Sequence, residues 1–313
     1  MRGRARITSA LALVVVLSLG GVRAGAEVSG PPLETDEATL RAALDCPATF
    51  IDSGREPVLL VHGTFANDEI NWSWGYAPSL TAAGYDVCTV ELPENGLDDI
   101  QVATEYVVFA VREMAARSDR FVDVLGVSQG GLEPRWAIKW WPDVQALIDD
   151  LVMLATPNHG TYQQPPGGIP CFASCYQMGA GSNFLATLNA GDETPGAISY
   201  TSIYTMFDEL VQPNTTSMVD GASNILIQDL CALRPVDHAL ISGDAVGYAL
   251  AVDAFSHPGP ADPVRFDPTT CFQAATPVVD GAAGLNATVN ELLFGIPQSG
   301  FVTSEPPLKP YAQ

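Results

Sequence analysis

The sequence has 313 residues and carries 14 lysines and arginines against 36 aspartates and glutamates, a formal net charge of −22 at pH 7. So strong an acidic excess disfavours nucleic acid and anionic membrane surfaces as partners and indicates a solvated acidic surface that serves solubility. With 47% hydrophobic residues, the chain is long enough for one large α/β domain, or two small ones, whose core needs no disulfides to form.

The first 26 residues have the three parts of a secretory signal peptide. The basic start "MRGRAR" precedes the apolar run "ITSALALVVVLSLGGV", and small residues follow in "AGA" at 24–26. The apolar run is shorter than the roughly 20 residues that span a membrane, and no later run offers such a length. We therefore expect a secreted, soluble protein without a transmembrane segment, in which residues 27–313 form a single domain.

Short apolar runs and helical patterns alternate from residue 57 onward. Strands are predicted at 57–63, 85–92, 121–128 and 151–156, and their nearly continuous apolar character indicates burial on both faces. Apolar residues recur at helical spacing between the second and third strands, which predicts a helix over 99–118. This order predicts an α/β fold, a mostly parallel doubly wound sheet with helices on both faces.

The second half of the chain is less regular. Residues 159–196 are rich in Gly, Pro and Ser, and such a long irregular stretch inside a domain is usually functional or mobile. Within it, 162–190 is the candidate for a lid or cap over a site. Strands are predicted again at 198–205 and 223–230, and no internal repeat or domain linker is evident.

Six cysteines form an even set, which in an exported chain favours disulfides over free thiols: Cys46, Cys88, Cys171, Cys175, Cys231 and Cys271. Spacing alone does not determine how they pair. In "CFASC", Cys171 and Cys175 have no second cysteine pair or nearby histidine that would complete a zinc site. A small closed loop is therefore the favoured reading of this pair, and no metal site is expected.

Ser128 lies in the pattern Gly-x-Ser-x-Gly, within "VDVLGVSQGGL". A predicted strand precedes it and a helix-like run follows, which is the context of a nucleophile elbow in an α/β-hydrolase. Gly126 and Gly130 fit that context, because side chains there would clash in a tight strand-to-helix turn. The pattern therefore predicts an exposed nucleophilic hydroxyl beside the first amides of a helix, which can stabilise an oxyanion.

A serine nucleophile needs a base, and four histidines are available. The α/β-hydrolase order places the base last in the chain, which removes His62 and His159. His257 lies in the turn-rich "SHPGPADP" and is read as a surface residue. His238, in "LRPVDHALISGD", is therefore the predicted base.

The acid should lie between Ser128 and His238, at the end of a strand, where it can accept a hydrogen bond from the imidazole. Asp208 follows the predicted strand 198–205 and is the favoured candidate. Glu209 is expected to point elsewhere, and Asp220 is the next alternative. Asp237 adjoins the histidine in sequence and is too close along the backbone for this role.

The loop after the first strand, "LLVHGTFAND", is expected to supply the oxyanion hole. His62 and Gly63 let the chain turn close to the serine, and Thr64 then offers a backbone amide and a hydroxyl. Gln129, directly after Ser128, offers a second amide.

Together, "PVLLVHGT", "ATEYVV", "SQGGL", "DELVQP", "VDHA" and "EPPLKPYA" resemble the Candida antarctica lipase B family of α/β-hydrolases, in an actinobacterial-looking form. The resemblance runs from about Cys46 to Tyr311. It implies Ser128 as nucleophile, Asp208 as acid and His238 as base, with Thr64 and Gln129 as the oxyanion hole. It also implies disulfides between Cys46 and Cys88 and between Cys231 and Cys271.

The sequence departs from that family at two places. Gly126 and Val127 replace a threonine and a tryptophan before Ser-Gln-Gly, so the wall beside the nucleophile should be less bulky. Cys171 and Cys175 have no recognised counterpart, and they lie in the candidate lid segment. All five tryptophans, including Trp136, Trp140 and Trp141 at helical spacing, are expected to be core residues rather than a substrate platform.

These observations predict a secreted serine hydrolase for carboxylic esters, most simply a triacylglycerol lipase or broad esterase that forms an acyl-enzyme on Ser128. Its partner is an ester or lipid substrate, met at an oil–water interface, and it is expected to work as a monomer without metal or organic cofactor. A polyester depolymerase or an acyltransferase could use the same triad. A non-catalytic binding protein with this fold is the alternative from another class.

Overall fold

The computed structural model describes residues 29–51, 53–163, 167–284, 286, 289 and 300–313. The predicted signal peptide, residues 1–26, lies outside this part of the chain. None of the helices in the described part is long and apolar enough to cross a membrane.

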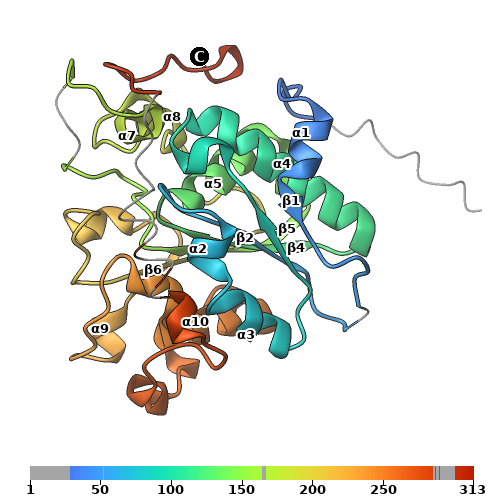
Figure 1. The fold of residues 1–313 in the computed structure, drawn as a ribbon, viewed down its shortest axis with the longest axis vertical. Coiled ribbons are helices and arrows are strands. Elements are labelled where there is room, and N and C mark those ends of the chain that lie inside the picture. The colour runs from blue at the N-terminus through green and yellow to red at the C-terminus, as the bar shows by residue number, and fades with distance from the viewer. Residues whose placement is uncertain (1–28, 52, 164–166, 285, 287–288, 290–299) are drawn as a thin grey trace, which may run out of the picture.

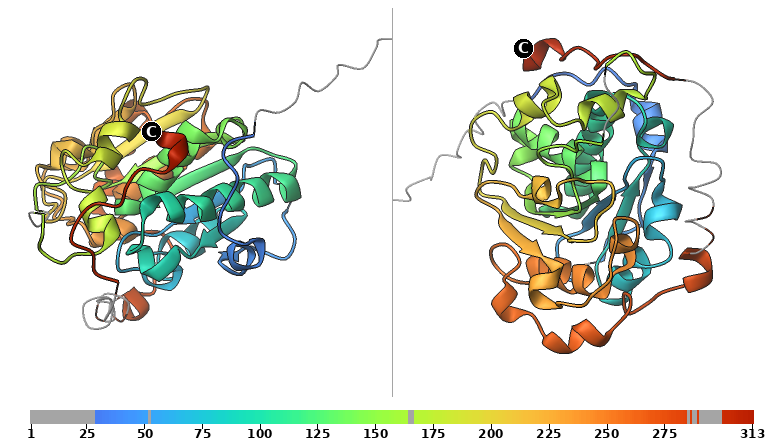
Figure 2. Two further views of the ribbon diagram at one scale, coloured as in Figure 1. Left: turned by 90° about the horizontal axis from the view of Figure 1, so that it is seen from above. Right: turned by 90° about the vertical axis from the view of Figure 1, so that its left-hand side faces the viewer.

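A seven-stranded sheet in the order β1-β3-β2-β4-β5-β6-β7 forms the centre of the molecule (Figures 1 and 2). All neighbouring strands are parallel except β1, which runs antiparallel to β3. The strands are β1 Leu44–Asp45, β2 Val58–Val61, β3 Val87–Val90, β4 Val122–Val127, β5 Ile148–Leu154, β6 Ser199–Tyr204 and β7 Ser223–Leu226. The predicted α/β-hydrolase architecture is confirmed.

Two layers of helices cover the sheet (Figure 2). Helices α1, α4, α5 and α8 pack with Leu59 and Val61 on one face, whereas α3 and α10 pack with Val58 and Leu60 on the other. Successive residues of β2 thus enter opposite cores, as the alternation of a strand requires. The helices are α1 Glu37–Ala42, α2 Asp68–Trp72, α3 Tyr76–Ala82, α4 Ile100–Ser118, α5 Leu132–Trp140, α6 Pro142–Gln145, α7 Ala173–Gln177, α8 Asn183–Leu188, α9 Ile227–Leu230 and α10 Ala245–Ser256.

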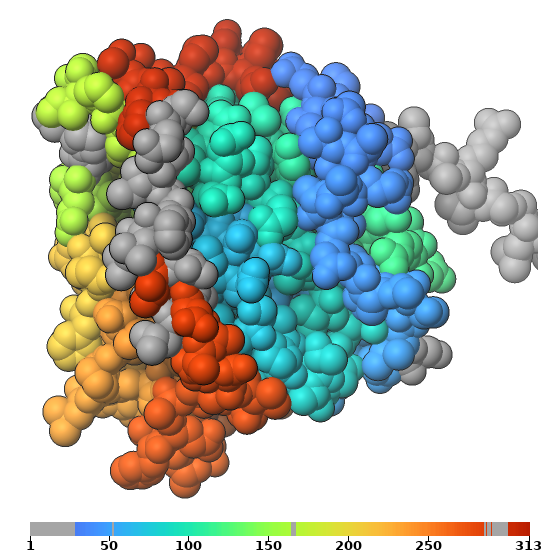
Figure 3. Space-filling model, in the orientation of Figure 1, coloured from blue at the N-terminus to red at the C-terminus, as the bar shows by residue number. Residues whose placement is uncertain are grey.

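Short 3₁₀ turns connect several of these elements. They are η1 Pro93–Gly96, η2 Ser128–Gly131, η3 Asn214–Ser217, η4 Leu240–Gly243, η5 Pro263–Arg265, η6 Pro268–Phe272 and η7 Pro310–Ala312. The C-terminal segment 300–313 lies over the α4 side of the molecule and close to the N-terminal residues (Figure 3). Lys309 fixes it there, since its backbone amide donates to Gln101 and its ammonium pairs with Glu34 at 2.6 Å.

Local sequence explains the longest helix. Asp99 caps α4 by accepting a hydrogen bond from the amide of Gln101, and Asp119 ends the helix in the left-handed region at φ 54°. The prediction of a helix over 99–118 is therefore confirmed. The predicted strand at 223–230 is wrong in its second half, because the chain turns into α9 after Leu226. That run has no residue that breaks a strand, so the change depends on tertiary packing.

All six cysteines are paired. The disulfides join Cys46 to Cys88, Cys171 to Cys175 and Cys231 to Cys271. The first links the chain before β2 to β3, and the third links α9 to η6. Trp72, Trp136 and Trp141 are fully buried and Trp140 packs at the edge of a core cluster, as predicted. The prediction is wrong for Trp74, which lines a cavity instead.

Gly130 is a position where the fold tolerates no side chain. A Cβ there would lie 2.2 Å from the carbonyl oxygen of Val61 and 2.5 Å from that of His62. Gly130→Ala should therefore lower the free energy of unfolding by about 3 kcal/mol or more, because backbone atoms of β2 must move. The measurement is urea unfolding followed by circular dichroism. Gly281→Ala is the control, since a Cβ there meets nothing within 4 Å, and an equal loss in both variants would contradict the argument.

Candidate active site

Ser128 lies on the turn between β4 and α5, at the carboxyl end of the sheet. Its φ of 55° is in the left-handed region, which a non-glycine residue rarely adopts. A Cβ on Gly126 would lie 2.0 Å from the carbonyl oxygen of Gly130. Both glycines of the Gly-x-Ser-x-Gly pattern are therefore needed for a backbone this tight, which holds the serine hydroxyl above the strand ends.

The three residues predicted as a triad form one hydrogen-bonded chain. His238 Nε2 lies 2.9 Å from Ser128 Oγ, and His238 Nδ1 lies 2.8 Å from Asp208 Oδ2. Because the carboxylate accepts at Nδ1, Nε2 is left free to accept the serine proton. Asp208 is 3% exposed and His238 is 8% exposed, so the chain is largely shielded from water.

Loop backbone holds the acid in place. Asp208 follows β6, and its Oδ1 accepts hydrogen bonds from the amides of Leu210 and Val211 at 2.9 and 2.7 Å. The neighbouring Glu209 does not bond the imidazole; instead its carboxylate accepts from the backbone amide of His238 at 3.2 Å. The two carboxyl groups thus fix the side chain and the backbone of the same histidine.

The alternatives weighed from the sequence lie elsewhere. Asp220 is exposed and its backbone contacts Glu193 and Thr194. Asp237 accepts from the amide of Leu240. His257 is an exposed residue at the end of α10.

Residues 62–67, between β2 and α2, form the loop expected to supply the oxyanion hole, here called the donor loop. His62 is buried beneath this loop and is not part of the triad. Its Nδ1 donates to the carbonyl of Gly63, and its Nε2 accepts from the amide of Leu92 at 2.9 Å. This pair of contacts requires the neutral ring with the proton on Nδ1. Burial lowers the pKa of His62 to about 4, which agrees with that assignment.

The side chains of Thr64 and Gln129, the two residues expected to form the oxyanion hole, contact each other. The hydroxyl of Thr64 donates to Gln129 Oε1 at 2.7 Å. A Cβ on Gly63 would lie 3.1 Å from that of Ser128, so the donor loop packs directly against the serine. Asn71 was not singled out from the sequence, yet its Oδ1 accepts the amide of Gly63 at 2.8 Å and stabilises this loop.

An apolar cavity of about 320 Å³ opens beside Ser128 and His238. Its apolar walls are Phe65, Ile70, Trp74, Val127, Phe172, Met178, Leu210 and Val211. Val127, which replaces a tryptophan of the resembled family, thus lines the cavity next to the serine. Phe172, Cys175 and Met178 come from 162–190, where the Cys171–Cys175 disulfide and a backbone bridge from Cys171 to Val302 tie the chain.

Comparisons with known proteins agree with this geometry. A family model described as "Lipase (class 2)" matches residues 105–240. Lipase B of Pseudozyma antarctica is 30% identical over 303 residues, which are 91% of this chain and 87% of that protein. The chain belongs to the lipase B family of α/β-hydrolases.

Solved structures support the family membership. The crystal structure of Aspergillus fumigatus lipase B has a TM-score of 0.84 at 30% identity, over 91% of this chain and 74% of that one. The propeptide form of the Bacillus licheniformis lipase BlEst2 has a TM-score of 0.55 at 14% identity, over 70% and 54% of the two chains, and shows a shared fold. As a lipase B family member, the chain is a hydrolase of carboxylic esters.

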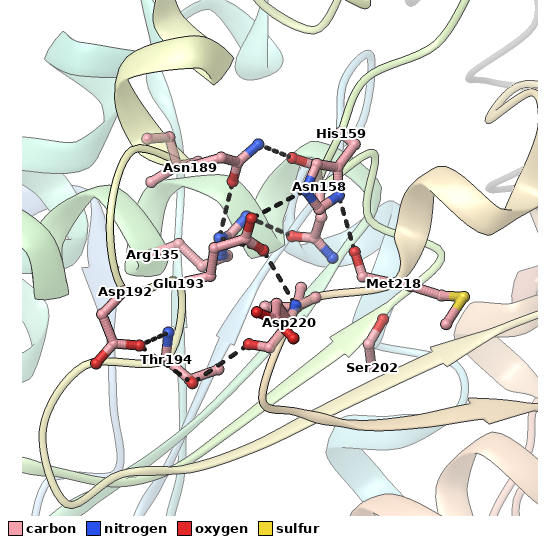
Figure 4. Close-up of polar contacts among 12 residues, drawn as sticks. Arg135, Asn158, His159, Asn189, Asp192, Glu193, Thr194, Ser202, Met218 and Asp220 are labelled. Atoms are coloured by element: carbon pink, nitrogen blue, oxygen red, sulfur yellow. Dashed lines mark hydrogen bonds and ion pairs between the residues drawn. The ribbon is translucent and has the colours of Figure 1, made fainter.

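A polar network around the buried Arg135, which the sequence did not predict, links α5 to the loops after β5 and α8 (Figure 4). Arg135, on α5, donates to Asn158 at 3.1 Å and to Asn189 at 2.9 Å, and Glu193 lies 3.8 Å away. Burial lowers the pKa of Arg135 to about 10, so the guanidinium remains charged at neutral pH. His159 bonds Glu193 from the other side at 3.1 Å, which joins the loop after β5 to 189–193.

The neutral, buried His62 predicts acid sensitivity. Its folded pKa of about 4 lies below the ordinary 6.5, so the unfolded chain binds more protons between these values. The stability contributed by the neutral ring is complete above pH 6.5 and is lost as pH falls toward 4, by about 3 kcal/mol in total. Urea unfolding across this range should give a shallower pH slope for His62→Asn than for the wild type. The exposed His257→Asn should keep the wild-type slope, and equal slopes in all three proteins would reject the assignment.

Proposed function

We propose that this lipase B family member is a secreted triacylglycerol lipase or broad esterase that works through an acyl-enzyme on Ser128. The observation that carries the proposal is the chain Asp208–His238–Ser128, with bonds of 2.8 and 2.9 Å at the mouth of an apolar cavity. A hydroxyl beside the free nitrogen of an oriented imidazole is the arrangement of an activated nucleophile.

The proposed reaction has two steps. Ser128 Oγ attacks the ester carbonyl while His238 Nε2 takes its proton, and the imidazolium is stabilised by Asp208. The oxyanion is held by the amides of Thr64 and Gln129 and by the hydroxyl of Thr64. When the intermediate collapses, the alcohol leaves with the proton from His238, and water then cleaves the acyl-enzyme by the same proton path. None of these steps calls for a metal or an organic cofactor.

The cavity walls favour an acyl chain as the bound group, because they are mostly apolar. Three apolar side chains that flank Asp208 along the chain, Met206, Phe207 and Leu210, are about half exposed, and Leu210 also lines the cavity. Such exposed apolar side chains suit a monomer that docks on an oil–water interface. The segment 162–190 remains our proposal for a lid or cap, since it supplies Phe172 and Met178 to the cavity.

One observation favours a second candidate. Val127 leaves more room beside the nucleophile than a tryptophan would, and this suits a bulky acyl donor such as an aliphatic polyester, or an acceptor alcohol for acyl transfer. Comparing turnover on tributyrin, triolein and polyester film shows which ester class the protein hydrolyses best. Measuring tributyrin turnover below and above its solubility limit then reveals any interfacial activation.

The decisive test replaces the triad residues. Ser128→Ala and His238→Ala should lower kcat for p-nitrophenyl butyrate by at least about 10⁴-fold, and Asp208→Asn by about 10⁴-fold, because each removes a participant in the same proton transfer. His257→Ala, at an exposed site, should retain wild-type turnover. Mass spectrometry after treatment with a serine-directed phosphonate should locate the label on Ser128. Full activity of Ser128→Ala would refute the mechanism, and failure of the wild type to react with any activated ester would support a binding protein instead.

A further inference from the structure

Glu133 is a buried carboxyl group that contacts the proposed oxyanion hole from behind. It lies in the first turn of α5 and has no exposed surface. Its Oε1 accepts a hydrogen bond from Gln129 Nε2 at 2.8 Å, and Gln129 Oε1 in turn accepts from the hydroxyl of Thr64 at 2.7 Å. The side chains of Glu133, Gln129 and Thr64 therefore form a continuous chain that ends at a proposed oxyanion donor.

The state of Glu133 affects what Thr64 can do. A hydroxyl has one proton to donate, so Thr64 can bond either Gln129 or an oxyanion at a given moment. An ionised Glu133 would polarise the Gln129 amide and make its oxygen a stronger acceptor. It would also place a negative charge in a region of low dielectric close to the developing oxyanion. Both effects oppose catalysis. A neutral Glu133 still accepts the hydrogen bond from the Gln129 side-chain amide, but it neither strengthens Gln129 as an acceptor nor adds a negative charge near the oxyanion.

We propose that Glu133 is a positioning residue for the oxyanion hole, and that its neutral form holds Gln129 in the orientation that lets Thr64 serve the transition state. The inference rests on the proposed function of Ser128. Complete burial raises the pKa of Glu133 to about 8, against smaller lowering effects from the Gln129 hydrogen bond and the local backbone. The group is thus mostly protonated at neutral pH and ionises in mild alkali.

Among the residues that the structure describes, no neighbouring charged group shifts the pKa of Glu133. Helix α5 packs against α4, α6, α8, η2 and β4. The titratable side chains on these elements and on α5 itself are Glu105, Tyr106, Arg112, Glu113, Arg117, Asp123, Arg135, Lys139 and Asp143. None of these groups contributes to the pKa shift of Glu133, which burial dominates.

The test compares pH profiles of kcat and KM for p-nitrophenyl butyrate between about pH 6 and 10. Wild-type kcat should fall above about pH 8. Glu133→Gln keeps a neutral acceptor of the same shape, so near pH 7 its kcat should stay within about threefold of wild type, and its fall in alkali should disappear. Glu133→Leu removes the acceptor and should lower kcat about tenfold at pH 7, with KM within about twofold.

Asp150→Asn is the matched control. Burial also raises the pKa of Asp150 to about 8, but this residue lies on β5 at the opposite end of the sheet from Ser128. Its replacement should leave the alkaline fall in place. The proposal is overturned if Glu133→Gln keeps the wild-type fall, or if Asp150→Asn abolishes it.

Phosphonate labelling in every variant separates this inference from the function on which it rests. If the wild type is not labelled on Ser128, the proposed mechanism fails whatever the profiles show. If Ser128 is labelled fully and Glu133→Gln keeps the wild-type profile, only the role of Glu133 is rejected. Glu133→Leu counts only if its urea unfolding is cooperative, and otherwise Glu133→Gln alone decides.

Discussion

The left-handed backbone of Ser128 is the constraint on which the site depends. A φ of 55° reverses the chain within one residue, and this brings Gly126 against Gly130 and Gly130 against the end of β2. Such a conformation costs free energy and persists only where packing enforces it. Here the buried β4 and α5 on either side enforce it. The exposed hydroxyl at the carboxyl end of β4 is thus a product of core packing.

The parallel sheet explains why residues far apart in sequence meet at this hydroxyl. The chain leaves β2, β4 and β6 at the same edge, so the loops that carry Thr64, Ser128 and Asp208 start close together. His238 arrives from the loop after α9, where the Cys231–Cys271 disulfide ties the chain to η6. Its backbone is then held by Glu209 and its ring by Asp208. Topology brings these groups near, and local hydrogen bonds set their orientation.

Features of this structure that depend on local sequence were predictable, whereas features that depend on contacts between distant residues were not. The elbow at Ser128 and the alternation of strands and helices were predictable, because Gly-x-Ser-x-Gly and the apolar runs are local signals. The turn into α9 after Leu226 was missed, since tertiary packing decides it. The bonds of Gln129 to Glu133 and Arg135 to Asn158 were also missed. In "GGLEPRW" Glu133 and Arg135 resemble residues of an ordinary helix surface, and the packing of α4, α6, α8, η2 and β4 around α5 buries them.

Burial favours the neutral form of ionisable groups at both ends of the sheet. At the amino end, Asp123 and Asp150 have raised pKa values, each through burial first and repulsion from neighbouring carboxylates second. At the carboxyl end, His62 and Glu133 are kept neutral at pH 7 by burial, and each contacts a residue of the donor loop or of the elbow. Ionisation of Glu133 would add a buried negative charge beside the proposed oxyanion hole, in a chain whose net charge is already −22. If the proposed oxyanion hole forms as we infer, a neutral Glu133 lets its backbone amides and the Thr64 hydroxyl stabilise the oxyanion through fixed dipoles, with no buried negative charge opposing them.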